Sequence, residues 1–172
     1  IIKINPIFDI DVFQNYKINH TLNKSRAFFK IEDGCNRFCS YCIIPYARGK
    51  VRSKDLDSII TEAQQLAKIG YKEIVLVGIN LSCYGTDLGS NLADAVDAVC
   101  SCKEIKRVRL GSLEPDLTTP DLILRLSKQS KFCPQFHMSL QSGSDSVLKR
   151  MRRKYTAEQY LSVCKNIKKY FP

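Results

Sequence analysis

The chain has 172 residues, 44% of them hydrophobic and 26% charged, which is typical of a globular domain and excludes a disordered or fibrous chain. The longest apolar runs are about five residues, too short to cross a bilayer. The sequence shows no basic segment followed by an apolar one, as a signal peptide would require. We therefore expect a cytoplasmic protein with no membrane partner.

The formal net charge is +10. Such a balance favours an anionic partner, most often nucleic acid, whereas a solvated basic surface explains it equally well. Composition alone does not decide between these two interpretations.

Secondary-structure signals begin near residue 26. Residues 1–25 show no clear hydrophobic period and are interpreted as a linker or the tail of a preceding domain. The predicted strands cover residues 27–31, 73–78, 108–110 and 136–140. The predicted helices cover residues 56–67, 92–99, 119–126 and 156–167, with a short one around residues 147–148.

Local residues set the expected ends of these helices. Ser53 is the expected N-cap of the first helix, and Gly70 is its expected C-terminal stop. Pro120 suits the first position of the third helix. Thr156 and Gln159 have the spacing of a capping box and predict the start of the last helix.

The alternation of strands and helices predicts an α/β fold with about four βα units and a right-handed parallel sheet. The continuous apolar run over 73–78 is typical of a parallel strand covered on both faces. Four strands do not close a barrel, so the sheet is either open or part of a (β/α) barrel. In both cases chemistry is expected at the C-terminal strand ends, where the loops at 33–52, 78–80, 112–115 and 141–144 should converge.

The first of these loops carries three cysteines with the spacing C-x3-C-x2-C: Cys35, Cys39 and Cys42. Three thiolates on one loop suit three irons of a 4Fe–4S cluster and leave the fourth iron open. A zinc site is the weaker alternative because it needs a further ligand, and His20 and His137 are distant in sequence. Without an export signal, metal or redox chemistry is favoured over a disulfide framework.

The C-x3-C-x2-C spacing after the first strand resembles the signature of the radical S-adenosylmethionine (SAM) enzymes. Further similarity to the methylthiotransferases, and most to those that act on tRNA threonylcarbamoyladenosine, lies in residues 26–36, 41–49, 107–115, 137–145 and 147–155. The resemblance implies a partial (β/α) radical SAM barrel over residues 26–172, apparently incomplete at its C-terminus. It also implies a 4Fe–4S cluster and SAM, which together generate a 5′-deoxyadenosyl radical.

Position by position, the resemblance assigns Cys35, Cys39 and Cys42 to the cluster and leaves the catalytic residues unknown. It places Tyr41 against the SAM adenine and Arg153 at the SAM carboxylate, where a guanidinium fork fits well. The other residues that it assigns to SAM lie at strand ends: Gly78, Asn80, Ser112, Glu114, Gln141 and Ser142.

The resemblance further implies methylthiolation of N6-threonylcarbamoyladenosine beside the tRNA anticodon, with tRNA and a flavodoxin or ferredoxin as partners. A methylthiotransferase acting on isopentenyladenosine tRNA or on a ribosomal protein, and a non-catalytic iron–sulfur or RNA-binding module, are the alternatives. Full-length members carry a second 4Fe–4S cluster in an N-terminal domain, which we do not recognise here. We therefore expect a fragment that is inactive by itself. The remaining cysteines are expected to be free thiols: Cys83, Cys100, Cys102, Cys133 and Cys164.

Overall fold

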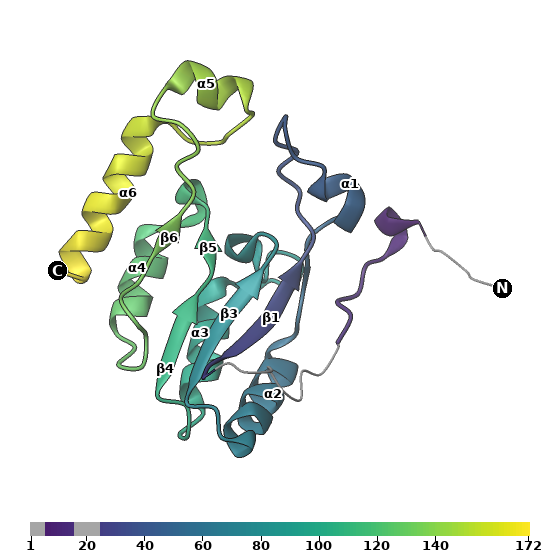
Figure 1. The fold of residues 1–172 in the computed structure, drawn as a ribbon, viewed down its shortest axis with the longest axis vertical. Helices are drawn as coiled ribbons and strands as arrows, with labels where there is room; N and C mark the ends of the chain where they lie inside the picture. The colour runs from purple at the N-terminus through teal and green to yellow at the C-terminus, as the bar shows by residue number, and fades with distance from the viewer. Residues whose placement is uncertain (1–5, 16–24) are drawn as a thin grey trace.

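The structure is a computed structural model that describes residues 6–15 and 25–172 (Figure 1). Its central sheet has the strand order β2-β1-β3-β4. Strands β1 (Ala27–Asp33), β3 (Glu73–Gly78) and β4 (Arg107–Leu110) are parallel, and the short β2 (Arg52–Ser53) pairs antiparallel with β1. Two short strands, β5 (Ser112–Leu113) and β6 (His137–Met138), form a second parallel pair.

Six α-helices connect and cover these strands in the described residues: α1 (Ile44–Arg48), α2 (Leu56–Ile69), α3 (Leu92–Ser101), α4 (Pro120–Ser127), α5 (Asp145–Arg150) and α6 (Ala157–Tyr170). Helices α2, α3, α4 and α6 follow one another side by side along the sheet, with α5 beyond the end of α6 (Figure 1). The α/β class, the parallel strands and the partial βα barrel architecture predicted from the sequence are therefore confirmed. Within the described residues, no helix is both long and apolar enough to cross a membrane.

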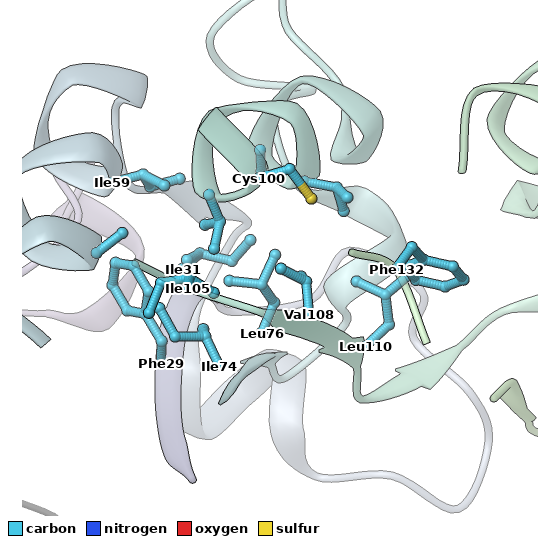
Figure 2. Close-up of a cluster of buried hydrophobic side chains, with 14 of the residues drawn as sticks. Phe29, Ile31, Ile59, Ile74, Leu76, Cys100, Ile105, Val108, Leu110 and Phe132 are labelled. Carbon is cyan, nitrogen blue, oxygen red and sulfur yellow. The ribbon is translucent and has the colours of Figure 1, made fainter. Parts of the chain in front are cut away.

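Alternate residues of the parallel strands form the hydrophobic core (Figure 2). Phe29 and Ile31 of β1, with Leu76 of β3, point toward the helices and are fully buried. The opposite face is only partly covered, because Phe28 keeps 39% of its surface exposed and its cross-strand neighbour Val75 is buried. The expectation of a sheet fully covered on both faces is therefore only partly met.

Three of the predicted helix ends are confirmed, and one of them is Pro120 at the first position of α4. Gly70 ends α2 in the left-handed conformation, with φ of 114°, which a residue without a Cβ adopts readily. Thr156 and Gln159 form a complete capping box at the start of α6. The predicted N-cap of α2 is wrong: Asp55 accepts the N–H of Ser58.

Ser53, which was the expected N-cap, instead lies in β2. Its N–H and hydroxyl both donate to the Asp87 carboxylate, at 2.8 and 2.5 Å. The side chain of Ser53 is therefore engaged by Asp87, a residue distant in sequence, and does not cap the helix. The loop predicted over 33–52 also contains α1, which begins at Ile44.

The fourth predicted strand, 136–140, shortens to His137–Met138. The reason lies in β4, which stops at Leu110 and gives way to Gly111, whose N–H donates to Leu76 at 2.9 Å. Residues 131–133 pair with Val108, so only the two residues opposite β5 remain for a ladder. Strand β6 is therefore short because the neighbouring strand is interrupted at Gly111, between β4 and β5.

The N-terminal residues fall partly outside the described residues, since 1–5 and 16–24 are not among them. The described part, 6–15, contains a 3-10 helix at Ile7–Asp9 and places Phe13 on the domain. The ammonium groups of Lys30 and Lys54 lie 5.9 and 5.5 Å from the centre of the Phe13 ring. A linker or tail role for residues 1–25 and a core boundary at residue 26 stay predictions.

Candidate functional site

The loop with the three cysteines starts where β1 ends. Asp33, the last residue of β1, accepts the N–H of Gly34 at 2.8 Å and pairs with Arg48 of α1. Burial raises the pKa of Asp33, but the hydrogen bonds and charges of Arg48 and Lys30 outweigh burial and hold this pKa below its usual range. Gly34 has φ of +87°, and a Cβ there would lie 1.9 Å from the Lys50 carbonyl oxygen. The backbone at the start of the loop therefore requires glycine.

Cys35 lies next to the end of β3. The Nδ2 atom of Asn80 lies 3.6 Å from the Cys35 sulfur, and the Asn80 backbone N–H donates to Glu32 Oε2 at 2.7 Å. Burial raises the pKa of the Cys35 thiol. The sequence thus correctly predicted that the Gly78–Asn80 turn would meet the cysteine loop.

Glu32 is a feature of this site that sequence reasoning missed. Its side chain is fully buried, and desolvation raises its pKa to about 8, against the opposing effect of the Asn80 hydrogen bond. Its Oε1 atom and the Oδ1 atom of Asn80 have no hydrogen-bond partner within the described part of the chain. A carboxyl group at the end of a predicted strand, directly after the apolar residue Ile31, was the signal that could have identified it.

Cys39 lies beside the guanidinium group of Arg153, whose Nη1 atom is 3.3 Å from the sulfur. The same guanidinium forms an ion pair with Glu114 and lies 3.5 Å from the Tyr41 hydroxyl. Burial opposes the charge of Arg153, but Glu114 outweighs burial and raises its pKa above the usual value. The Arg153 guanidinium also lies over the ring of Tyr155, with 5.2 Å between its carbon atom and the ring centre.

One backbone hydrogen bond ties the loop to the C-terminal part of the chain, and another lies within the loop. The Ser40 N–H donates to the Met151 carbonyl at 3.2 Å, and the Cys42 N–H donates to the Cys39 carbonyl at 3.0 Å. Arg37 forms an ion pair with Asp116, which follows β5. The loop is therefore held by residues far from it in sequence.

Not all predicted SAM residues join this centre. Ser112 shares a 2.7 Å hydrogen bond with His137 Nδ1 on the exposed side of the β5–β6 pair. Gln141 is exposed with φ of 63°, and Ser142 bonds within its own turn, where its Oγ atom accepts the Ser144 N–H. Four of the predicted SAM residues contact the cysteine loop or one another: Asn80, Glu114, Tyr41 and Arg153. In the described structure, these four receive no hydrogen bond from Ser112, Gln141 or Ser142 and donate none to them.

The three loop cysteines are half-buried free thiols. Across residues 6–15 and 25–172, no three His, Cys, Asp or Glu side chains are arranged to hold a metal ion, and His20 lies outside these ranges. A 4Fe–4S cluster suits the loop better than a single ion, because it distributes three cysteines over three separate irons. The amide of Asn80 and the guanidinium of Arg153 are N–H donors beside two of the sulfurs, the kind of contact that stabilises cluster sulfur ligands.

The remaining cysteines are free thiols, as expected, and all of them except the half-buried Cys164 are buried. Cys83 is buried, and desolvation together with the charge of Cys35 raises its pKa to about 12. Burial also raises the pKa of Cys100 to about 11.

Comparison with known proteins identifies the class. Residues 30–172 match the radical SAM superfamily. The fold is similar to the radical SAM methyltransferase TsrM from Kitasatospora setae, with a TM-score of 0.67 and 14% identity over 84% of this chain and 28% of that one. It is also similar to the cobalamin-dependent SAM radical enzyme OxsB, with a TM-score of 0.65 over 84% of this chain and 22% of that one.

Within the radical SAM superfamily, the chain is similar in sequence to curated proteins that are named as tRNA-modifying enzymes. The chain is 43% identical to the threonylcarbamoyladenosine tRNA methylthiotransferase MtaB of Chlamydia pneumoniae, over 92% of this chain and 38% of that protein. It is 40% identical to MtaB of Bacillus subtilis, over 98% of this chain and 38% of the relative. It is also 40% identical to a tRNA-2-methylthio-N(6)-dimethylallyladenosine synthase of Clostridium botulinum, over 100% of this chain and 38% of the relative.

The chain therefore belongs to the radical SAM superfamily, and within it the sequence is similar to methylthiotransferases. The family implies a 4Fe–4S cluster and SAM as cofactors. The chain spans about two fifths of the length of the curated relatives that it matches.

Proposed function

We propose that this chain is the radical SAM core of a tRNA methylthiotransferase that modifies N6-threonylcarbamoyladenosine beside the anticodon. The observation that carries the proposal is the cysteine loop at the ends of the parallel strands, with N–H donors from Asn80 and Arg153 on two of its sulfurs. Parallel α/β folds place their chemistry at this end of the sheet.

In the proposed site, Cys35, Cys39 and Cys42 hold the cluster and leave one iron position for SAM. A reduced cluster held by these cysteines would supply one electron for cleavage of SAM to methionine and a 5′-deoxyadenosyl radical. The chain's own residues orient the cofactors and exclude water from them.

The residues proposed to contact SAM are Tyr41, Gly78, Asn80, Ser112, Glu114, Gln141, Ser142 and Arg153. Of these, Ser112, Gln141 and Ser142 make no hydrogen bond to the others in the described structure. Tyr41 and Asn80 are supported by their positions beside Arg153 and Cys35. Arg153 would meet the SAM carboxylate only by sharing its guanidinium with Glu114, since the two already form an ion pair. A guanidinium has donors for two such partners.

The choice of substrate rests on the names of the relatives. MtaB proteins are named for threonylcarbamoyladenosine tRNA, and relatives of nearly equal identity are named for dimethylallyladenosine tRNA, which is the alternative substrate. We propose tRNA, through its anticodon loop, and a flavodoxin or ferredoxin as partners in the cytoplasm. The net charge of +10 is consistent with an RNA partner.

We expect SAM cleavage by this chain alone to be slow and its methylthiolation of tRNA to be absent. The chain matches 38% of the length of its MtaB relatives. We propose that the second 4Fe–4S cluster lies in the part of those proteins that the chain does not match. Nucleoside mass spectrometry of modified tRNA after anaerobic incubation checks this. Repeated turnovers by the chain alone would contradict it.

The experiment that tests the proposed function is SAM cleavage by the reconstituted, reduced chain under anaerobic conditions. Formation of 5′-deoxyadenosine and a SAM-dependent change in the EPR signal of the cluster are expected. A cluster that forms but neither responds to SAM nor cleaves it would favour an iron–sulfur carrier or a non-catalytic RNA-binding module.

A further inference from the structure

A cavity of about 720 Å³ lies between the cysteine loop and the chain that links α5 to α6. Residues 36–38 form one wall, and residues from 145 to 159 form the other. The volume is in the range of small-molecule and nucleotide sites. The hydrogen bond from the Ser40 N–H to the Met151 carbonyl joins the two segments that carry these walls.

This cavity is separate from the residues assigned to SAM. Of the eight residues assigned to SAM, only Arg153 lines it, and the guanidinium of Arg153 is already paired with Glu114 beside Cys39. Arg37, on the opposite wall, is likewise paired with Asp116. Neither arginine is therefore a free cation for a ligand in the cavity.

Three other cations line the cavity without a counter-ion. Lys149, Arg152 and Lys154 form no ion pair in the part of the chain that the structure describes, and all three are exposed. One carboxylate lines the cavity, that of Asp145, and its Oδ1 atom accepts the N–H of Ala157 at 2.8 Å. The cavity therefore has an excess of positive charge available to an anion.

Both walls also hold a residue in a strained conformation. Phe38 has φ of 51° and Arg152 has φ of 57°, a region that side chains other than glycine seldom adopt. Phe38 nevertheless leaves 38% of its surface exposed, with its ring edge-to-face against Tyr46 at 5.6 Å. Strain of this kind persists where the surroundings fix it, often at a binding site.

We propose that this cavity binds single-stranded RNA, with backbone phosphates on Lys149, Arg152 and Lys154 and one base against the ring of Phe38. Unpaired cations next to an exposed aromatic ring are the combination that single-stranded nucleic acid requires, because phosphates need charge and unstacked bases need a flat apolar surface. The inference rests on the proposed tRNA substrate and specifies where the RNA is held. An acidic protein would use the cations but would have no need of the Phe38 ring.

The test measures binding of a fluorescently labelled anticodon stem–loop RNA by anisotropy over a range of salt concentrations. The cavity variant carries Lys149→Gln, Arg152→Gln and Lys154→Gln. The matched control carries Lys103→Gln, Lys106→Gln and Lys128→Gln, which change the charge equally at exposed positions at the other end of the sheet. Thermal unfolding of both variants confirms that each is folded.

We expect the cavity variant to bind RNA roughly tenfold or more weakly than the control at low salt. Its slope of log affinity against log salt should fall by about 2, since each single-strand phosphate contact contributes roughly 0.7. Phe38→Leu should weaken binding at least fivefold, because base stacking on an aromatic ring contributes on the order of fivefold to a hundredfold. Phe38→Tyr, which keeps the ring, should bind nearly as the unmodified chain does.

Equal losses in the two charge variants would overturn the inference in favour of diffuse attraction, while the proposed RNA substrate would stand. Unchanged RNA binding with weaker binding of an acidic flavodoxin would also overturn it, in favour of a protein partner at this cavity. Failure of the unmodified chain to bind the RNA would overturn both the inference and the proposed RNA substrate. Failure of SAM cleavage alone would concern the proposed function and leave RNA binding at the cavity unaffected.

Discussion

The guanidinium of Arg153 lies 3.3 Å from the sulfur of Cys39, although the two residues are 114 positions apart in sequence. Arg153 follows α5, so this contact fixes the cysteine loop to a part of the chain beyond all the described strands. Glu114, at the end of β5, holds the guanidinium in place. The three residues connect the cysteine loop, the second strand pair and the C-terminal helices.

Removal of Arg153 should be strongly destabilising. Its side chain is 4% exposed and that of Glu114 is 16% exposed, so Arg153→Ala leaves a carboxylate buried without its partner. We expect a loss of roughly 3–5 kcal/mol in the free energy of unfolding, measured by urea denaturation. The double variant Arg153→Ala, Glu114→Ala should lose less than the sum of the two single losses, because it removes both charges. Strict additivity would contradict the importance of this ion pair.

The raised pKa of Glu32 predicts how stability depends on pH. Its pKa rises from 4.5 to about 8 on burial, so between these values the folded chain holds a proton that the unfolded chain has lost. Stability should therefore be highest below about pH 4.5 as far as this group is concerned, and should fall as pH rises toward 8. The fall is on the order of 3–5 kcal/mol.

Urea denaturation of the cluster-free chain between pH 5 and 9 measures this effect. Glu32→Gln keeps an oxygen for the Asn80 N–H but cannot ionise, so it should remove most of the decline. Glu158→Gln, a control at an exposed position in the first turn of α6, should keep the decline of the unmodified chain. The same slope in both variants would show that Glu32 is not the responsible group.

Strand positions and the cysteine loop were predictable because both depend on local sequence. The starts of β1, β3, β4 and β6 fall at or within one residue of the predicted positions, since apolar runs bounded by turn residues mark them directly. The three cysteines lie on one loop whatever the tertiary structure. The meeting of that loop with Asn80 followed from the rule that parallel strand ends share one edge.

Other features depended on contacts between distant segments. Ser53 and Asp55 both suit an N-cap, and the pairing of Ser53 with Asp87 determines which of them caps α2. The burial of Glu32 depends on the close approach of β3, which no local pattern shows. Likewise, Arg152 and Arg153 are adjacent arginines in the sequence, whereas the structure pairs Arg153 with Glu114 and leaves Arg152 exposed.

Assignment of the cluster to three cysteines predicts a selective loss of iron. Replacing Cys35, Cys39 or Cys42 with Ala should almost abolish the brown absorbance of the reconstituted chain, because no other side chain there supplies a comparable soft ligand. The paired replacement Cys100→Ala, Cys102→Ala is the control, since both thiols are buried in the core. Iron and sulfide analysis per folded molecule gives the measurement. Loss of iron from the control pair would refute the assignment.

Gly78 ends β3 at the point where the cysteine loop approaches, and its lack of a side chain should be essential. A Cβ at this position would lie 2.5 Å from Glu32 Oε2 and 3.0 Å from the Glu32 Cβ. Because Glu32 is fully buried and bonded to the Asn80 N–H, it has little room to move away. We therefore expect Gly78→Ala to cost roughly 1–3 kcal/mol in the free energy of unfolding.

Gly143 supplies the control, because it lies in the loop after β6 and has nothing within 4 Å of an added Cβ. Gly143→Ala should change stability by less than about 0.5 kcal/mol. The two variants should also differ in SAM affinity, measured by isothermal titration of the reconstituted chain, because displacement of Glu32 would move Asn80 away from Cys35. If Gly78→Ala proved as stable as Gly143→Ala and bound SAM equally well, then β3 and β1 would not be packed as closely at this point as the structure shows.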